Sequence, residues 1–320
     1  MLKALAAATA KPPRIPFAVT DGPFLKFYRE YLVNHYFTGI EEEYRKSEAF
    51  TNDIAEHTHL RTVRFHDALV PWTQKVFDLT GSTVCEIGSG TGSSTIAFAP
   101  YVDRIHCFEL DKKSTHAAQA RLNFFNVQNV SFEDELFGPQ SSFVTAGRLA
   151  DIVLFVAVLE HMTFNELDAA LKAAFTALRP GGIIIVAETP NRLSVFDYHS
   201  SWLPFYQWLP LDVRRRYHNR SPRQHFAYDI GNVSKASPKE VEERLTRWGR
   251  GISYHDFELA LGEGVHDMIV ADGWEPEVRA LAPVFKDDEI LLDIFKKFEI
   301  SANKAFARSW LYLILRKPID

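Results

Sequence analysis

Glycines in the first half of the chain have the spacing of a site for a charged cofactor. Gly88, Gly90 and Gly92 follow an apolar run, with Ser89 and Thr91 between them, and precede a segment with a helical pattern. Glycine adopts backbone conformations closed to other residues and lets a ligand approach the main chain closely. The free amides at a helix start favour a negative group. A pyrophosphate or the carboxylate of a bound amino acid would satisfy this loop.

Two neighbours of the loop separate these ligands. The dinucleotide-binding fingerprint has Gly or Ala at its third position, where this chain has Ser93. Glu86 ends the apolar run two residues before Gly88. A carboxylate repels a pyrophosphate and attracts the ammonium group of an amino-acid moiety. The loop therefore favours a cofactor that contains an amino acid over a dinucleotide.

A second carboxylate ends the next apolar run, 21 residues after Gly88. Glu109 stands at this place, and a carboxylate there can accept hydrogen bonds from both hydroxyls of a ribose. Sites for NAD use the same device, so this residue alone does not identify the cofactor. Asp111 is expected to cap the helix that begins at Lys112.

Two further motifs follow in the order that one known family has. Asp151 begins an apolar run that leads into Leu159-Glu160-His161, and Leu178-Arg179-Pro180-Gly181-Gly182 ends a helix before the next run. Together with Glu86 to Gly92 and Glu109, these motifs resemble the class I S-adenosylmethionine (SAM)-dependent methyltransferases. The resemblance covers about residues 83–192, and it is specific for fold and cofactor but not for the substrate.

The resemblance implies SAM as the cofactor and S-adenosylhomocysteine (SAH) as the product. It places the glycine loop against the methionine part of SAM and Glu109 on its ribose. The acidic residue that touches the adenine amine in the family is not defined here, because residues 131–136 lack the common Gly-Asp pair. The expected cofactor contacts are Glu86, Gly88, Ser89, Gly90, Gly92, Glu109, Leu110, Asp134, Glu135 and Ala157.

Short apolar runs alternate with helical segments, which predicts an α/β fold with a mostly parallel sheet and helices on both faces. The predicted strands are Thr83–Ile87, Ile105–Phe108, Val130–Phe132, Asp151–Val156, Ile183–Ala187, Ile252–Ala260 and Trp310–Leu315. The resemblance implies seven strands, the last antiparallel. Helices are predicted at Asp53–Leu79, Ser94–Tyr101, Lys112–Phe125, Asn165–Leu178, Pro238–Gly249 and Asp287 to about Phe306.

The chain divides into four predicted parts. Residues 1–80 form an N-terminal helical extension or lid, and 81–189 form the SAM-binding core. A large aromatic and basic insertion after the fifth strand spans 190–236. Residues 237–320 complete the core and contain a helical insertion.

Methyl transfer from a sulfonium is an in-line displacement, so the protein positions the acceptor, excludes water and removes a proton where the acceptor is a hydroxyl. His161 follows the fourth strand and is the candidate general base; alternatively, it packs the turn. Acceptor contacts are predicted from the N-terminal helix and from the loop after the fifth strand. They are Tyr28, Tyr31, His35, Asn191 and Arg192. Alternatively, the aromatic stripe of the N-terminal helix packs in the core, and the loop after the fifth strand is only a turn.

The insertion has an apolar, aromatic stretch at residues 202–210, followed by Arg214, Arg215 and Arg216. This composition suits an amphiphilic, anionic acceptor, a peripheral membrane contact or a subunit interface, or else simple packing on the core. The predicted function is methyl transfer from SAM to a small-molecule or lipid-like acceptor. A non-catalytic partner-binding subunit, another SAM-derived transfer such as aminopropyl transfer and, least favoured, an NAD-dependent oxidoreductase are the alternatives.

Composition narrows the partners and the compartment. The net charge of −5 disfavours nucleic acid as the main partner. Cys85 and Cys107 fall in neighbouring predicted strands and are expected to be buried thiols. The start, Met1 to Ala10, is short for a secretory signal, and no apolar run reaches the ~18 residues of a membrane span. We therefore expect a cytoplasmic protein. An oligomer is left open. His57-x-His59 lacks clustered carboxylates or cysteines, so no metal is expected.

Overall fold

The computed structural model describes residues 17–235 and 237–319, so the Met1–Ala10 segment lies outside the described residues. Its centre is a seven-stranded sheet in the order β3-β2-β1-β4-β5-β7-β6. Strands β1 to β5 are parallel, and β7 is antiparallel to both β5 and β6. The predicted α/β class and the antiparallel last strand are confirmed. The strands are β1 (Thr83–Ile87), β2 (Arg104–Phe108), β3 (Val130–Glu133), β4 (Ala150–Val156), β5 (Leu178–Pro190), β6 (Ile269–Asp272) and β7 (Trp310–Arg316).

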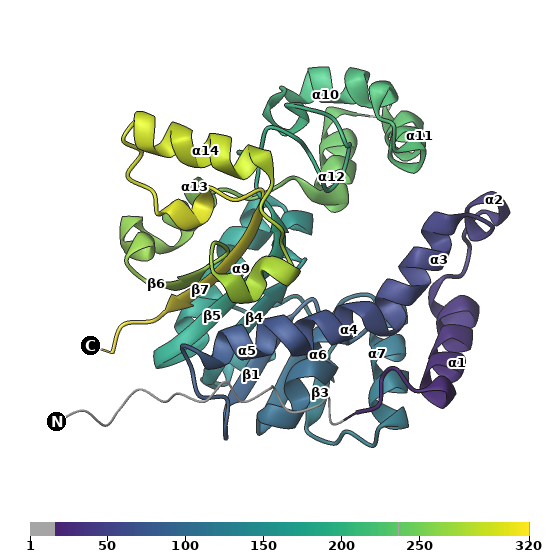
Figure 1. The fold of residues 1–320 in the computed structure, drawn as a ribbon, viewed down its shortest axis with the longest axis vertical. Helices are drawn as coiled ribbons and strands as arrows, with labels where there is room; N and C mark the ends of the chain where they lie inside the picture. The colour runs from purple at the N-terminus through teal and green to yellow at the C-terminus, as the bar shows by residue number, and fades with distance from the viewer. Residues whose placement is uncertain (1–16, 236, 320) are drawn as a thin grey trace.

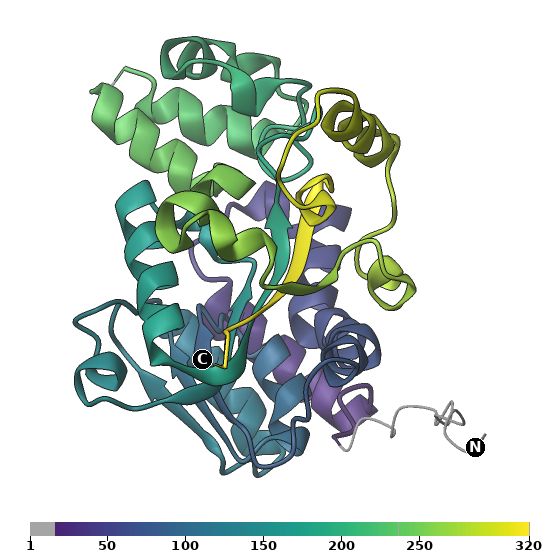
Figure 2. The ribbon, with the colours of Figure 1, turned by 90° about the vertical axis from the view of Figure 1, so that its left-hand side faces the viewer.

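Helices cover both faces of this sheet (Figures 1 and 2). They are α1 (Gly22–Tyr31), α2 (Glu42–Arg45), α3 (Glu48–Ala55), α4 (Arg61–Arg64), α5 (Val70–Gln74), α6 (Ser93–Phe98), α7 (Lys112–Phe124), α8 (Ser142–Thr145), α9 (Phe164–Ala177), α10 (Leu211–Tyr217), α11 (Gln224–Val233), α12 (Pro238–Gly249), α13 (Tyr254–Leu261) and α14 (Lys286–Lys297). In the described part of the chain, no helix has the length and apolarity to cross a bilayer.

Alternating side chains of the strands divide the core into two layers. On one face, residues such as Cys85 and Val153 pack against α8, α9, α13 and α14. On the other face, residues such as Val84 and Cys107 pack against α5 and α6. Both cysteines are buried free thiols, as predicted. Because both faces are covered, the strands are apolar on both sides, which is the pattern seen in the sequence.

The N-terminal helices form a third layer. The aromatic stripe of α1 is buried against α7 in a separate apolar cluster that includes Phe24 and Tyr28. Helices α3, α4 and α5 follow one another through two π-helical turns, Glu56–Leu60 and Phe65–Leu69. Such turns often occur at functional sites, because the extra residue re-aims the side chains around it. This helical run ends at Gln74, not at Leu79 as predicted.

The insertion after β5 has its own core. Leu203, Tyr206 and Phe226 from the insertion pack with Val241 and Leu245 of α12. Helices α10, α11 and α12 therefore gather at one end of the molecule (Figure 1), where His225 of α11 stacks on Tyr44 of α2 with the ring centroids 6.0 Å apart. The packing extends this unit to the end of α12, beyond the predicted boundary at residue 236.

One predicted strand and a second predicted helix end also differ from the structure. The Ile252–Ala260 strand is wrong, because residues 254–261 form α13 and the sixth strand is Ile269–Asp272. Asp256, Phe257 and Ala260 are buried while Leu259 is exposed, which is a helical period read as an apolar run. The predicted helix from Asp287 to about Phe306 ends at Lys297, shortly before Glu299 takes a left-handed conformation.

Candidate cofactor and acceptor site

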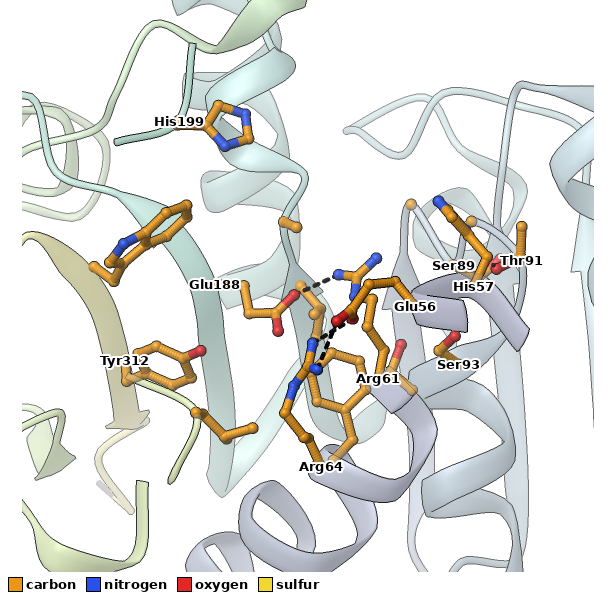
Figure 3. A pocket seen from close by; sticks show the side chains of 18 of the residues that line it. Glu56, His57, Arg61, Arg64, Ser89, Thr91, Ser93, Glu188, His199 and Tyr312 are labelled. Carbon is orange, nitrogen blue, oxygen red and sulfur yellow. Dashed lines mark hydrogen bonds and ion pairs between the residues drawn. The ribbon is translucent and has the colours of Figure 1, made fainter. Parts of the chain in front are cut away.

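A cavity of about 640 Å³ opens at the carboxyl ends of β1, β4 and β5 (Figure 3). This is the edge of an open α/β sheet where ligands bind, and the volume falls in the range of ligand pockets, roughly 300–1,000 Å³. The glycine loop forms one wall. The N-terminal helical run, the end of β5, His199 of the insertion and residues of β7 form the others.

The glycine loop has the backbone that its composition predicted. Gly88, Gly90 and Gly92 have φ angles of 69°, 53° and 77°, in the left-handed region. A Cβ on Gly88 would overlap the Val158 side chain. The Gly88 amide donates to the Phe108 carbonyl at 2.8 Å, which ties the loop to β2. The loop is therefore held closely against the ends of two strands.

Two serines of this wall have unused hydroxyls. Ser89 and Ser93 are 5% exposed and line the cavity, and neither hydroxyl oxygen has a hydrogen-bond partner among the described residues. Buried polar atoms normally find partners, so an unpaired pair in a cavity wall marks a place for a polar ligand. The amino-acid end of SAM offers a carboxylate that two hydroxyls can bind. The residues present therefore fit this cofactor.

Glu86 lies at the end of β1, where its carboxylate holds the next helix. This carboxylate is 1% exposed and accepts hydrogen bonds from the hydroxyls of Ser94 and Thr95. Burial raises its pKa, and the two hydroxyls oppose that rise. The carboxylate therefore fastens the start of α6 to β1, and contact between Glu86 and the cofactor ammonium stays a prediction.

Glu109 supports the loop and keeps free acceptor capacity. Its two carboxylate oxygens accept the amides of Gly90 and Asp111, each at 2.8 Å. Each carboxylate oxygen has two lone pairs, so both can still accept a ribose hydroxyl. Asp111 caps α7 through the amides of Lys113 and Ser114, as expected. Leu110 beside them is 57% exposed.

The two predicted adenine contacts lie outside the cavity wall. Asp134 is exposed and pairs with Lys112 at 3.5 Å, and Glu135 accepts the Ser142 amide at 2.7 Å. Ala157, in contrast, lines the cavity at the end of β4 with a φ of +50°. Glu188 at the end of β5 is also left-handed, with a φ of +51°. Non-glycine residues in this region are strained, and such strain clusters at functional sites.

His161 lies in the cavity as predicted, and two groups that the sequence did not single out lie beside it. Its Nδ1 bonds the Arg247 carbonyl at 2.8 Å. His199 lines the same cavity, with its ring centroid 5.4 Å from that of His161. Burial lowers the pKa of His199 to about 3 and also lowers that of His161. Glu160 is fully buried, and both its oxygens lack partners; burial raises its pKa to about 8.

The predicted acceptor residues of the N-terminal helix do not line the cavity. Tyr28 is fully buried, and its hydroxyl bonds the carbonyls of Thr91 and Ala117, so it supports the glycine loop from behind. The rings of Tyr31 and His35 lie near the surface with their centroids 4.6 Å apart and their planes tilted by 42°. Acceptor contact at these three positions stays a prediction.

The loop after β5 is also structural. The Asn191 side chain is buried and donates to the carbonyls of Phe306 and Arg308. Arg192 pairs with Asp256 at 2.7 Å, which fixes α13. Neither residue lines the cavity, and acceptor contact at both stays a prediction. The cavity residue is Glu188, which precedes this loop.

The N-terminal helical run supplies polar groups that the sequence analysis missed. Arg61 pairs with Glu188, and Arg64 pairs with Glu56 at 2.6 Å (Figure 3). His57 lines the cavity and bonds the Thr91 hydroxyl at 3.1 Å. Helical periodicity located this segment, but nothing in its pattern showed that the π-turns aim these side chains at the end of β5.

Comparison with known proteins agrees with this geometry. Residues 85–184 match the family described as a methyltransferase domain. None of the curated proteins compared with the chain matches it significantly. Solved structures that resemble it include an S-adenosylmethionine-dependent methyltransferase from Clostridium acetobutylicum (13% identity, 48% of this chain and 60% of that chain, TM-score 0.39). Another is the N-methyltransferase NodS from Bradyrhizobium japonicum with S-adenosyl-L-homocysteine (17% identity, 51% and 74%, TM-score 0.34). These likenesses carry no information on the acceptor.

The sheet order, the glycine loop and the family match define one class. Residues 85–184 match a methyltransferase domain, and the sheet order and the glycine loop are consistent with a class I SAM-dependent methyltransferase. The match supports S-adenosylmethionine as the cofactor. The match spans the strands from β1 into β5, and the N-terminal helices and the insertion lie outside it.

Proposed function

We propose that this protein transfers the methyl group of SAM to an O–H or N–H group of a small molecule. The observation that carries the proposal is that two different sets of polar groups lie at opposite ends of one cavity. The free hydroxyls of Ser89 and Ser93 lie at one end, and the rings of His161 and His199 lie at the other. A cofactor on the glycine loop therefore faces a group that can accept a proton.

The chain's own residues have three tasks in this reaction. The bound cofactor supplies a methyl group already activated by a sulfonium charge. The glycine loop holds its amino-acid end, and Glu109 holds its ribose. The apolar wall of Phe285, Trp310 and Tyr312 positions the acceptor and excludes water.

His161 is the candidate base. Its Nδ1 is occupied by the Arg247 carbonyl, so Nδ1 carries the proton and Nε2 has the free lone pair. Burial lowers its pKa, which keeps the ring neutral and ready to accept a proton near pH 7. Proton removal by a positioned base accelerates such reactions by roughly 10²–10⁴-fold. His161→Gln should therefore lower kcat by about that factor, with SAH binding retained.

Cofactor binding is the first test. SAH should raise the melting temperature, whereas NAD should not, because a ligand that binds the native state at 100 times its Kd adds about 2.7 kcal/mol. The double variant Ser89→Ala/Ser93→Ala should lose most of this shift. Ser142→Ala, at the exposed first residue of α8, is the matched control. No shift at millimolar SAH would contradict the proposal.

An amphiphilic, anionic acceptor is a second candidate, and one surface of the insertion favours it. Trp202, Phe205 and Trp208 are each nearly half exposed, and the basic residues of α10 lie in the same unit. Labelled SAM incubated with a panel of phenols and amines, and separately with anionic lipids in detergent, separates the two candidates. Label in the lipid fraction that falls in Trp202→Ser/Phe205→Ser would favour the amphiphilic acceptor.

A further inference from the structure

Three side chains at the acceptor end of the cavity form a group that the transfer reaction, as proposed above, does not use together. A carboxylate oxygen of Glu160 and one ring nitrogen each of His161 and His199 all lie within 4.8 Å of one another. The Glu160 Oε1 atom is 3.7 Å from His161 Nε2, too far for a hydrogen bond. These are the ligand types of a two-histidine, one-carboxylate metal site.

The Glu160 carboxylate is the strongest sign of a missing partner. It is 0% exposed, and neither oxygen accepts a hydrogen bond from any residue that the structure describes. A buried carboxylate without a partner is costly, and such groups are normally paired or bind a metal. The His161 Nε2 atom, 3.7 Å from Glu160 Oε1, likewise has no hydrogen-bond partner among the described residues.

The two histidines are held in the state that a metal requires. His161 donates its Nδ1 proton to the Arg247 carbonyl, which leaves a lone pair on Nε2, 3.7 Å from Glu160 Oε1. Histidines that bind metals characteristically make such a hydrogen bond with the other nitrogen. His199 makes no ring hydrogen bond within the described chain, so its nitrogens are free.

The loop that carries His199 is held in place by hydrogen bonds and by packing. The Asp197 carboxylate accepts the amides of His199, Ser200 and Ser201. Gly249 packs against the ring, and a Cβ there would overlap it. These contacts fix the ring near His161, although the two residues are far apart in sequence and belong to different units.

We propose that Glu160, His161 and His199 bind one divalent transition-metal ion that prefers imidazole ligands, such as Zn²⁺ or Fe²⁺. An ion about 2.0–2.2 Å from each ligand brings the ligand atoms to roughly 3–3.5 Å of one another, which requires a closure of about 1 Å or less for the 3.7 Å pair. Three protein ligands leave a coordination position open toward the cavity. The acceptor oxygen or nitrogen takes that position, so the metal orients it.

This inference deepens the proposed function and changes the role of one residue. With the metal bound, His161 Nε2 would be a ligand and no longer the base. The metal would lower the pKa of the bound acceptor, whose proton would pass to solvent water. The expectation from sequence, that no metal binds, rested on the His57 pair. In the structure His57 forms a hydrogen bond with Thr91 instead, and the potential metal ligands are Glu160, His161 and His199.

Metal content and Co²⁺ spectra test the site without an acceptor. Tag-free protein is stripped with a chelator, dialysed and titrated with Zn²⁺, Co²⁺ and Mg²⁺. We expect one equivalent of Zn²⁺ or Co²⁺, a visible Co²⁺ absorption band, and no comparable binding of Mg²⁺, which prefers oxygen ligands. Less than a fifth of an equivalent, or binding of Mg²⁺ alone, would overturn the site.

Variants assign the ligands. Glu160→Gln and His199→Gln should each weaken Co²⁺ binding at least tenfold, whereas His116→Gln, at an exposed position on α7, should bind as the wild type does. Unchanged binding in both ligand variants would also overturn the proposal. If neither variant folds, the wild-type stoichiometry and spectrum decide. The SAH melting shift, measured on the same stripped protein, tests the proposed methyl transfer separately, because it does not require the metal.

Discussion

The Arg61 guanidinium and the Glu188 carboxylate form an ion pair across the cavity, between the N-terminal helical run and the end of β5 (Figure 3). The residues are 127 positions apart, and their side chains are 25% and 17% exposed. The desolvation of Arg61 opposes its charge, but the nearby Glu188 carboxylate outweighs it, so the pKa of Arg61 is raised. This pair fixes the helical run, and with it the cavity wall.

Breaking this pair should destabilise the protein. Arg61→Met leaves Glu188 without its cation in a partly buried site. We expect a loss of roughly 1–3 kcal/mol in the free energy of unfolding, between the values for exposed and fully buried pairs. Urea denaturation measures it. The exposed pair of Lys46 and Glu42 is the matched control, and Lys46→Met should change stability by less than about 0.5 kcal/mol. Equal effects of the two variants would contradict a structural role for the pair.

The glycine loop should not tolerate a side chain at Gly88. Gly88→Ala adds both the cost of a left-handed alanine, about 1–2 kcal/mol, and an overlap with Val158. We expect SAH to lose its melting shift. Gly147 has a similar φ of +65° with nothing near its Cβ position. Gly147→Ala should therefore lower stability without affecting SAH binding, which separates the overlap from the conformational cost.

Glu109 and Asp134 are both predicted to contact the nucleoside of the cofactor. Alanine variants of the two should differ in their affinity for SAH. Glu109→Ala removes an acceptor that also orders the Gly90 amide. Hydrogen bonds to charged groups contribute about 1.5–3 kcal/mol, so SAH should bind about 10- to 150-fold more weakly by calorimetry. Asp134→Ala removes only an exposed pair with Lys112. A loss in Asp134→Ala comparable to that in Glu109→Ala would show that the region after β3 closes onto the adenine.

Stability should depend on pH through His57. Burial lowers the pKa of His57 in the folded protein to about 3, against about 6.5 in an unfolded chain. Below pH 6.5 the unfolded chain therefore binds a proton that the folded protein does not. Stability is lost as the pH falls from 6.5 toward 3.

Urea denaturation of the stripped protein at pH 7.5, 6.5, 5.5 and 4.5 measures this slope. His57→Gln cannot take up the proton and should lose less stability over this range. His116→Gln, at an exposed position, should follow the wild type. A slope in His57→Gln as steep as in the wild type would contradict the assignment.

Much of the core followed from local sequence. The first five predicted strands all form parallel strands of the sheet. The positive φ angles of Gly88 and Gly92 follow from a loop that only glycine can form. The cap at Asp111 is likewise a local matter, since its partners are the next residues along the chain. The prediction of a strand at Ile252–Ala260 was wrong because a short apolar run has too few residues to distinguish the period of a strand from that of a helix.

Direction and partners of side chains were decided by the tertiary structure. The sequence placed Glu86 beside the glycine loop, but only the packing of α6 on β1 turned its carboxylate toward Ser94 and Thr95. Tyr28 and Asn191 have the polar ends expected of acceptor residues, yet carbonyls from distant segments use those ends. A side chain's hydrogen bonds depend on which segments fold against it, and the spacing of residues in the sequence does not reveal those segments.

The cavity around the glycine loop shows which features the sequence determined and which only the tertiary structure decided. Its sequence determined the backbone conformation and the kind of cofactor, because both depend on residues adjacent in the chain. The acceptor end was decided only in three dimensions, where β5 brings Glu188, the insertion brings His199 and the N-terminal helix brings Arg61 to one cavity. These residues come from segments up to 138 positions apart, so long-range packing alone sets their distances.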